Sequence, residues 1–262
     1  MQDNTDTYRF EQIELFDPIS LGEMDKVKLM NRTDTKYWFH MDILQNLLEK
    51  IQDSYYILTM DNEVAIPYST IYYDTPTNRM YTAHHNGKLN RYKIRRRSYV
   101  LSGISFLEVK FKSNKGRTIK KRIQTDFGKD VFNEKESAFI RNITPFTTDD
   151  LSPSLMNSFS RITLVNKNFT ERCTVDFNLN FKNGPNHIML NNLVVAEIKA
   201  DISSSASPLA RAMKNQRIKT SSFSKYCIGK AMTDSSVKRN AFKHKTRMIE
   251  KTIKKSSYIT VN

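Results

Sequence analysis

The 262-residue chain contains little glycine, little cysteine and no long apolar run. Its seven glycines form neither a Walker-type phosphate loop nor a kinase-type glycine loop, which disfavours a phosphate site made from glycine-rich backbone. Cys173 and Cys227 show no CxxC spacing and no Cys/His cluster, so a reducing compartment is expected. No stretch approaches a bilayer span, and the polar N-terminus is unlike a signal peptide. We therefore expect a cytoplasmic protein, at most peripheral at the inner face of a membrane.

Positive charge is abundant in this chain. The formal net charge is +15 and the sequence pI is about 9.7. Such an excess repels itself in a compact fold unless the protein meets an anion, such as nucleic acid, an acidic membrane or a polyphosphate-like ligand. Hydrophobic residues make up 39% of the chain and aromatic residues 11%, which is enough for a core and excludes a wholly disordered chain.

About half of the excess charge lies at the C-terminal end. Residues 238–262 hold eight Lys and Arg residues against one acid, Glu250. This segment is either a solvated, frayed terminus or a basic amphipathic helix that contacts anionic lipid, RNA or a partner, including a membrane protein. We divide the chain into a domain over 1–236, with its core at about 16–230, and a basic tail over 237–262.

Hydrophobic periodicity and turn residues predict the secondary structure. Helices are expected over 16–32, 41–52 (with Asp42 as N-cap), 133–143 and 207–216. Strands are expected over 34–40, 68–76, 90–100, 104–112, 117–125, 157–166, 171–181 and 191–201. Roughly eight strands with helices at their ends predict a single antiparallel α+β domain.

Most of these strands have one apolar and one charged face. In "NRYKIRRRSYV" (90–100) the period of two places Arg91, Lys93, Arg95 and Arg97 on one side. For any one strand, the ordinary interpretation is the wet side of an open antiparallel sheet. Across the set, however, cations greatly outnumber acids, and like charges opposite one another destabilise a sheet. We therefore predict an eight-stranded antiparallel β-barrel, with a cationic interior and helices packed outside.

A cationic lumen of this size predicts the ligand class. The bore of an eight-stranded barrel is too narrow for duplex nucleic acid, which makes nucleic acid an unlikely partner, whereas a nucleoside triphosphate or a chain of phosphates fits. Arginine forks and lysine point charges suit phosphate oxygens. The carboxylate of Glu197 suits Mg²⁺ or Mn²⁺ bridging phosphates; its ordinary alternative is an ion pair with a neighbouring arginine.

Several segments, in order, carry a resemblance to a known family. These are "LMNRTDTKYWF", "IYYDTPTNRMY", "RYKIRRRSY", "FLEVKFK", "KKR", "SRITL", "RCTVDF", "VVAEIKAD" and "FSKYCIG". Together they resemble the VTC domain, the polyphosphate polymerase module of the vacuolar transporter chaperone complex and its bacterial relatives. This domain belongs to the triphosphate tunnel metalloenzyme (CYTH-like) superfamily. The resemblance covers about residues 16–230.

The resemblance implies an eight-stranded tunnel that transfers the γ-phosphate of ATP to polyphosphate with Mn²⁺ or Mg²⁺ bound. The residues implied to hold the reacting triphosphate are Lys36, Arg95, Arg97 and Lys225. Those implied to bind further phosphates are Lys110, Lys120 (or Lys121, since the register is open), Arg161, Arg172 and Ser224. The charged faces of the strands add Arg91, Lys93, Arg122 and Lys199 as expected phosphate contacts. Glu197 is implied to bind the metal, with Asp34 as a weaker second ligand. Expected partners are ATP and polyphosphate or pyrophosphate, with inositol phosphates as a further option.

Three departures from the family pattern keep other functions open. The hydrolytic branch carries ExExK on its first strand, where this chain has Arg32, Asp34 and Lys36; this favours the polymerase-like branch. Ser222 replaces a usual lysine, and Phe159 a frequent tyrosine. The alternatives are a triphosphate hydrolase, a non-catalytic polyphosphate or inositol-phosphate sensor and, ranked lowest, a nucleic-acid-binding domain.

Overall fold

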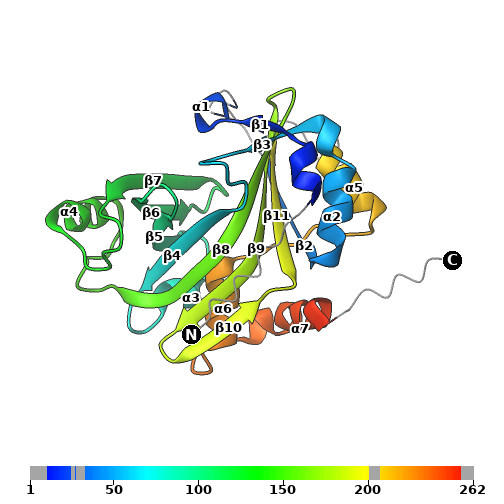
Figure 1. Ribbon diagram of the computed structural model, residues 1–262. Coiled ribbons are helices and arrows are strands. Elements are labelled where there is room, and N and C mark those ends of the chain that lie inside the picture. Colours follow the sequence, from blue (N-terminus) through cyan, green and yellow to red (C-terminus); the bar gives the residue numbers. More distant parts are fainter. Residues whose placement is uncertain (1–10, 25–26, 28–32, 201–206, 255–262) are drawn as a thin grey trace. The chain divides into compact units, whose positions relative to one another are not determined.

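The computed structural model describes residues 11–24, 27, 33–200 and 207–254 (Figure 1). The chain forms two compact units. The first unit comprises 1–64, 162–175 and 194–222, and the second comprises 65–161, 176–193 and 223–262. Two long strands, β8 and β9, contribute residues to both units.

The described residues form eleven strands, seven α-helices and two 3-10 turns (Figure 1). The strands are β1 Asp17–Ile19, β2 Thr33–His40, β3 Tyr55–Leu58, β4 Ile66–Asp74, β5 Arg91–Tyr99, β6 Ile104–Lys112, β7 Thr118–Thr125, β8 Ser152–Asn166, β9 Glu171–Asn183, β10 Asn186–Leu190 and β11 Leu193–Ala200. The helices are α1 Leu21–Met24, α2 Asp42–Glu49, α3 Arg79–His85, α4 Glu134–Ile143, α5 Pro208–Asn215, α6 Lys225–Thr233 and α7 Asn240–Lys254; the 3-10 turns are Glu11–Leu15 and Gln52–Ser54.

Eight strands follow one hydrogen-bonded path, β2-β11-β9-β8-β4-β5-β6-β7, which confirms the predicted α+β class and its large antiparallel sheet. The predicted closure into a barrel is not seen among the described strands, because the path ends at β2 and β7. β7 is exposed at most positions, as expected of an edge strand with a hydrogen-bonded neighbour on one side only. The sheet is therefore open in its hydrogen bonding.

In the first unit, the start of the chain differs from the prediction of a helix over 16–32. Asp17–Ile19 forms β1, which pairs in parallel with β3, and the described helix there spans only Leu21–Met24. Residues 25–26 and 28–32 lie outside the described part of the chain. Proline has no N–H to donate, so Pro18 suits a short strand at the edge of a sheet. Pairing with β3 thus outweighs the helical spacing.

The predicted N-cap of α2 is also wrong. Met41 occupies the N-cap position without a side-chain hydrogen bond, and Asp42 is the first helical residue. The Asp42 backbone N–H donates to Nδ1 of His40 at 3.2 Å. The side-chain acceptor at the start of this helix is therefore the His40 imidazole and not the Asp42 carboxylate. α2 lies beside α5 in this unit (Figure 1), where Gln216 donates to Asn46 at 2.7 Å.

In the second unit, the apolar faces of β5 and β6 are covered as predicted. Ile94, Leu107 and Val109 are buried in a cluster with Ile140 of α4 and Tyr73 of β4. α4 lies alongside this part of the sheet (Figure 1). Because side chains alternate along a strand, this cover leaves the Arg95 and Arg97 side chains on the opposite face of β5.

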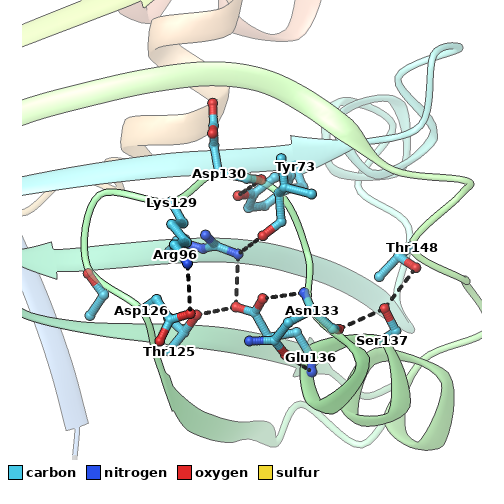
Figure 2. A network of polar contacts seen from close by, with 12 residues as sticks. Tyr73, Arg96, Thr125, Asp126, Lys129, Asp130, Asn133, Glu136, Ser137 and Thr148 are labelled. Atoms are coloured by element: carbon cyan, nitrogen blue, oxygen red, sulfur yellow. Dashed lines mark hydrogen bonds and ion pairs between the residues drawn. The ribbon is translucent and has the colours of Figure 1, made fainter.

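Arg96 is the exception on the apolar face, and it is buried in an ion pair. Its Nη2 donates to Glu136 at 2.8 Å and to the Val131 carbonyl at 3.2 Å (Figure 2). Glu136 also accepts from the Thr125 hydroxyl of β7 and completes a capping box with Asn133 at the start of α4. One carboxylate therefore fastens β5, β7 and α4 together.

Helix α6 is fastened in a comparable way by Asp74, at the end of β4. The buried Asp74 carboxylate accepts from the backbone N–H groups of Met80 (2.9 Å) and Tyr81 (2.8 Å) and from the Tyr226 hydroxyl (2.5 Å). Gly229 lets α6 approach the sheet, since an added Cβ would lie 2.4 Å from Cδ1 of Phe181. No helix in the described residues is both long and apolar enough to cross a membrane.

We predict that R96M lowers the free energy of unfolding by about 3–5 kcal/mol, because it leaves the Glu136 charge buried without its cation. Urea unfolding followed by circular dichroism measures this change. The double variant R96M/E136L should recover part of the loss, because it removes the buried charge but also the capping box and the hydrogen bond from Thr125. K129Q is the control, because it removes the exposed pair of Lys129 with Asp126, and it should cost under about 1 kcal/mol. Equal losses in R96M and K129Q would contradict the prediction.

Candidate anion-binding site

The cations of β5 are buried in the second unit. Arg97 is 8% exposed and the Arg95 side chain 12%, so neither guanidinium lies on a solvent-washed surface. β6 and β7 extend this face, since Glu108 lies opposite Arg95 and Lys110 lies opposite Lys120. The strand register therefore brings residues far apart in the sequence into one charged layer.

Glu108 provides the first countercharge in this layer. Its carboxylate is fully buried and accepts from Nε of Arg95 at 2.7 Å, and it also pairs with Lys120 of β7. Burial alone would raise the pKa of Glu108, but Arg95, Arg97 and Lys120 together hold it below its ordinary value. The carboxylate is thus ionised throughout the physiological range.

Asp176 of β9 provides the second countercharge. It binds the guanidinium of Arg161 with two hydrogen bonds, of 2.5 and 2.8 Å, and pairs with Lys225 at the start of α6. Burial opposes ionisation here too, yet Arg161 and Lys225 lower the pKa of Asp176. β8, β9 and α6 thus meet at one carboxylate.

Two stacked aromatic rings lie beneath these cations. Tyr68 of β4 and Phe159 of β8 are 5.3 Å apart and nearly parallel, at 6°. Arg97 lies 5.8 Å from both ring centroids, Arg161 lies 5.0 and 5.3 Å away, and the Lys225 ammonium lies 4.3 Å from Phe159. The negative ring faces stabilise the cations without adding a carboxylate that would compete with an anionic ligand.

Arg97 is the most buried cation of the layer. Like Lys110, it has no ion-pair partner among the described residues, and its buried Nε has no hydrogen-bond acceptor there. Burial, with Arg95 and Arg161 nearby, lowers its pKa to about 10. Unpaired buried donors of this kind cost stability unless an acceptor is bound, so Arg97 points to an anionic ligand.

Two lysines in the layer titrate near neutral pH. Arg95, burial and Arg97 lower the pKa of Lys110 to about 6. Burial lowers the pKa of Lys225 to about 8, although Asp176 opposes the shift. A bound anion would favour the charged form of both amines.

A second group of cations lies further along β5. Lys93 donates to the Ser224 hydroxyl at 3.2 Å, and Ser224 also caps α6. His84 of α3, to which the sequence analysis assigned no role, lies close enough to Lys93 and Arg91 to be affected electrostatically: burial and these cations lower its pKa to about 3. Its imidazole is therefore neutral, and nothing in its sequence context signals this placement.

The first unit holds its own charged group. Glu197 of β11 pairs with Lys36 of β2 and, at 2.9 Å, with Lys199. The predicted alternative for Glu197, an ion pair, is thus present, with lysines in place of an arginine. Arg172 is half-buried on β9 and Asp34 is exposed at the start of β2.

The structure groups most, but not all, of the expected site residues. The buried layer of the second unit gathers Arg95, Arg97, Lys110, Arg161 and Lys225 around Glu108 and Asp176, and Lys120 reaches Glu108 from the edge strand β7. Both Lys120 and Lys121 are exposed, and Lys120 is the one that pairs with Glu108. Arg122 is exposed and lies 4.5 Å above the Phe106 ring, outside this layer. Arg32 lies outside the described residues.

The described carboxylates fit a divalent metal only together with phosphate. No three His, Cys, Asp or Glu side chains of the described chain lie close enough together to hold a metal ion. Glu197 is a single carboxylate between two lysines. Mg²⁺ is commonly bound by one or two carboxylates plus substrate phosphates and water, and this donor set fits that mode.

Comparisons with known proteins identify a family and a shared fold. The family model described as VTC domain matches residues 31–233. No curated protein matches this chain. A solved structure from Hippeastrum, titled as a putative adenylyl cyclase, HpAC1, with a dominant triphosphatase activity, is 11% identical. It covers 77% of this chain and 97% of its own, with a TM-score of 0.50, so it shares the fold.

Weaker structural matches come from two Pyrococcus proteins. A conserved hypothetical protein from Pyrococcus furiosus is 11% identical, covers 75% of this chain and 99% of its own, and has a TM-score of 0.39. A protein from Pyrococcus horikoshii is 7% identical, covers 71% of this chain and 94% of its own, and has a TM-score of 0.36. The match of the family model confirms the predicted resemblance to the VTC domain.

We predict that tripolyphosphate binding takes up about one proton near neutral pH. Lys110 is mostly neutral above its pKa of about 6, and the bound anion raises that pKa, so affinity should fall as pH rises from about 6 to 8. Calorimetry in buffers of different ionisation enthalpy measures the uptake. K110M should reduce it, whereas K121M, at an exposed lysine, should not. Equal uptake in both variants would assign the proton elsewhere.

We predict that Y226F weakens tripolyphosphate binding several-fold, because the Tyr226 hydroxyl fixes α6 and hence Lys225. Y81F is the matched control: Tyr81 is equally buried, and its hydroxyl donates to the Lys238 carbonyl at 2.9 Å. Both variants should lose about 1–2 kcal/mol of stability. Only Y226F should lose affinity, and equal affinities would show that the hydroxyl has no positioning role.

Proposed function

The chain belongs to the VTC domain family, and on that premise we propose that it transfers the γ-phosphate of ATP to a polyphosphate chain. The observation that carries the proposal is Arg97, which is buried and has no ion-pair partner among the described residues. It lies with Lys110 and with four cations that share two carboxylates. A linear phosphate anion supplies the several charges and acceptors that this layer requires. ATP and polyphosphate or pyrophosphate are the proposed ligands.

The layer suits phosphate better than nucleic acid. Arg95, Arg97, Arg161 and Lys225 are at most 14% exposed, which suits single phosphate groups better than a rigid duplex. The Tyr68 and Phe159 rings stack on each other and carry cations above them, so they are not free platforms for bases. We therefore keep nucleic acid as the lowest-ranked ligand.

In the proposed reaction the protein supplies position and charge. Arg95 and Arg97 hold the oxygens of the transferred group and neutralise the charge that develops on them. Lys225, with a pKa of about 8, is charged when the anion is bound and adds a third positive group. Lys36, which belongs to the first unit, is also proposed to contact the triphosphate. Arg161 is held by Asp176 and keeps Lys225 in place through that shared carboxylate.

A divalent metal, Mn²⁺ or Mg²⁺, supplies further charge neutralisation when bound with the phosphates. Glu197 is the residue proposed to hold it, with Asp34 as a weaker second. The other proposed phosphate contacts are Arg91, Lys93, Lys110, Lys120, Arg122, Arg172, Lys199 and Ser224. The exposed position of Arg122 makes it the weakest member of this set.

The second candidate is hydrolysis of a triphosphate by the same site. The same cations would neutralise the same phosphoryl group, with water as the acceptor in place of a phosphate chain. A non-catalytic sensor of polyphosphate or inositol phosphate would use the layer for binding alone. The products distinguish the three: polymer, free phosphate, or neither.

We predict that incubation with ATP and Mn²⁺ gives polyphosphate visible on a gel, and that E197Q abolishes it. E197Q should leave tripolyphosphate affinity within about threefold, because Lys36 and Lys199 lose only a neighbouring carboxylate. E250Q, at an exposed acid of α7, is the control and should behave as the unmodified chain. Unchanged turnover in E197Q would defeat the metal assignment.

Other products would separate the remaining candidates. Free phosphate without polymer would favour the hydrolase. Tight binding of polyphosphate or inositol phosphate without ATP consumption would favour the sensor. Retention of RNA at moderate salt in place of polyphosphate would favour the nucleic-acid interpretation.

A further inference from the structure

Helix α7 is an ordered part of the second unit, which excludes the frayed-terminus interpretation for Asn240–Lys254. Ile249 is fully buried. The Phe242 ring packs against the rings of Tyr81 and His85, with centroid distances of 5.9 and 5.6 Å. The Ala241 N–H donates to Nε2 of His85 at 3.1 Å. α7 lies beside α6 (Figure 1), and its apolar side is occupied by this packing.

The opposite side of α7 is a row of cations. Lys243, Arg247, Lys251 and Lys254 follow one another at spacings of four, four and three residues, which places them on one face of a helix. All four are exposed, and the row spans roughly 16 Å at 1.5 Å per residue. We call these four residues the α7 row.

The α7 row differs from the buried layer in having no countercharges. None of its members forms an ion pair with another residue of the described chain. Glu250 is the one acid within the helix. Like charges at i and i+4 destabilise a helix, so the row is unfavourable for folding alone and suits an anionic surface.

We propose that the α7 row docks the protein on a bilayer of anionic lipid. A rigid helix held on one side presents all four cations to a plane at once, and each can gain from the negative surface potential. Phe242 and Ile249 are packed inward, so the contact is with headgroups and does not insert apolar side chains. The inference is independent of the proposed catalytic function.

The same face is poorly suited to nucleic acid. It carries no Phe, Tyr or Trp ring on which a base could stack, and Asn240, at the first position of the helix, is its one amide side chain. The other exposed residues of α7 are Asn240, Ala241, His244, Met248 and Glu250. Charge complementarity with a flat anionic surface is the property that the four residues of the α7 row share.

Cosedimentation of the full chain with vesicles tests the proposal. Binding is expected to vesicles that contain phosphatidylglycerol, but not to pure phosphatidylcholine, and it should be lost in high salt because the contact is electrostatic. The variant K243Q/R247Q/K251Q/K254Q should reduce the partition coefficient at least about tenfold. The matched control is K115Q/R117Q/K135Q/K182Q, which removes four exposed cations elsewhere in the second unit and should reduce it less than about threefold.

Two checks make the outcome decisive. Both variants should keep the thermal unfolding midpoint and the tripolyphosphate affinity of the unmodified chain, which separates loss of docking from misfolding and from failure of the buried site. If the two variants lose vesicle binding equally, the proposal is overturned, because the net charge of the protein would then explain the binding without the α7 row. Absence of binding to anionic vesicles, or tighter retention of RNA than of vesicles through the same row, would also overturn it.

Discussion

Two buried carboxylates, Glu108 and Asp176, allow several cations to lie together inside the second unit. An isolated charge is costly to bury, and several neighbouring cations would be more so without these two acids and the stacked rings of Tyr68 and Phe159. The compensation is incomplete, because Nε of Arg97 has no acceptor among the described residues. In the proposed function, a bound anion would supply the missing acceptor.

The opposite faces of the same strands provide the rigidity that this layer needs. On β5, Ile94 and Arg96 join an apolar cluster and a carboxylate hub, while Arg95 and Arg97 face the other way. The hub at Glu136 connects β5 to β7, the strand that carries Lys120, and Asp74 connects β4 to α6, the helix that carries Lys225. Polar groups far from the ligand therefore set where the cations stand.

Much of this arrangement could be predicted from the sequence, because period-two alternation fixes which side chains share a face of a strand. The long strands and the phase of Arg95 and Arg97 follow from it. The short strands β3 and β10 and the helices α3 and α6 were not predicted, since their few residues depend on partners distant in the chain. The open sheet path, the pairing of Lys120 and the isolation of Arg97 are likewise long-range results. The helix predicted over 16–32 does not begin at residue 16, because Asp17–Ile19 pairs with β3 as strand β1.

Arg95, Arg96 and Arg97 are consecutive, so the sequence of β5 specifies its pairing register with β4 and β6 only weakly at these positions. A slip of one residue reverses which side chains face each side of the sheet, yet here an arginine would still occupy two of the three central positions. The correct alignment is then distinguished by the flanking residues: Ile94, which is fully buried, and Ser98, whose hydroxyl lies 2.7 Å from that of Ser105. The fidelity of folding in this strand therefore rests on an isoleucine and a serine that never meet the ligand.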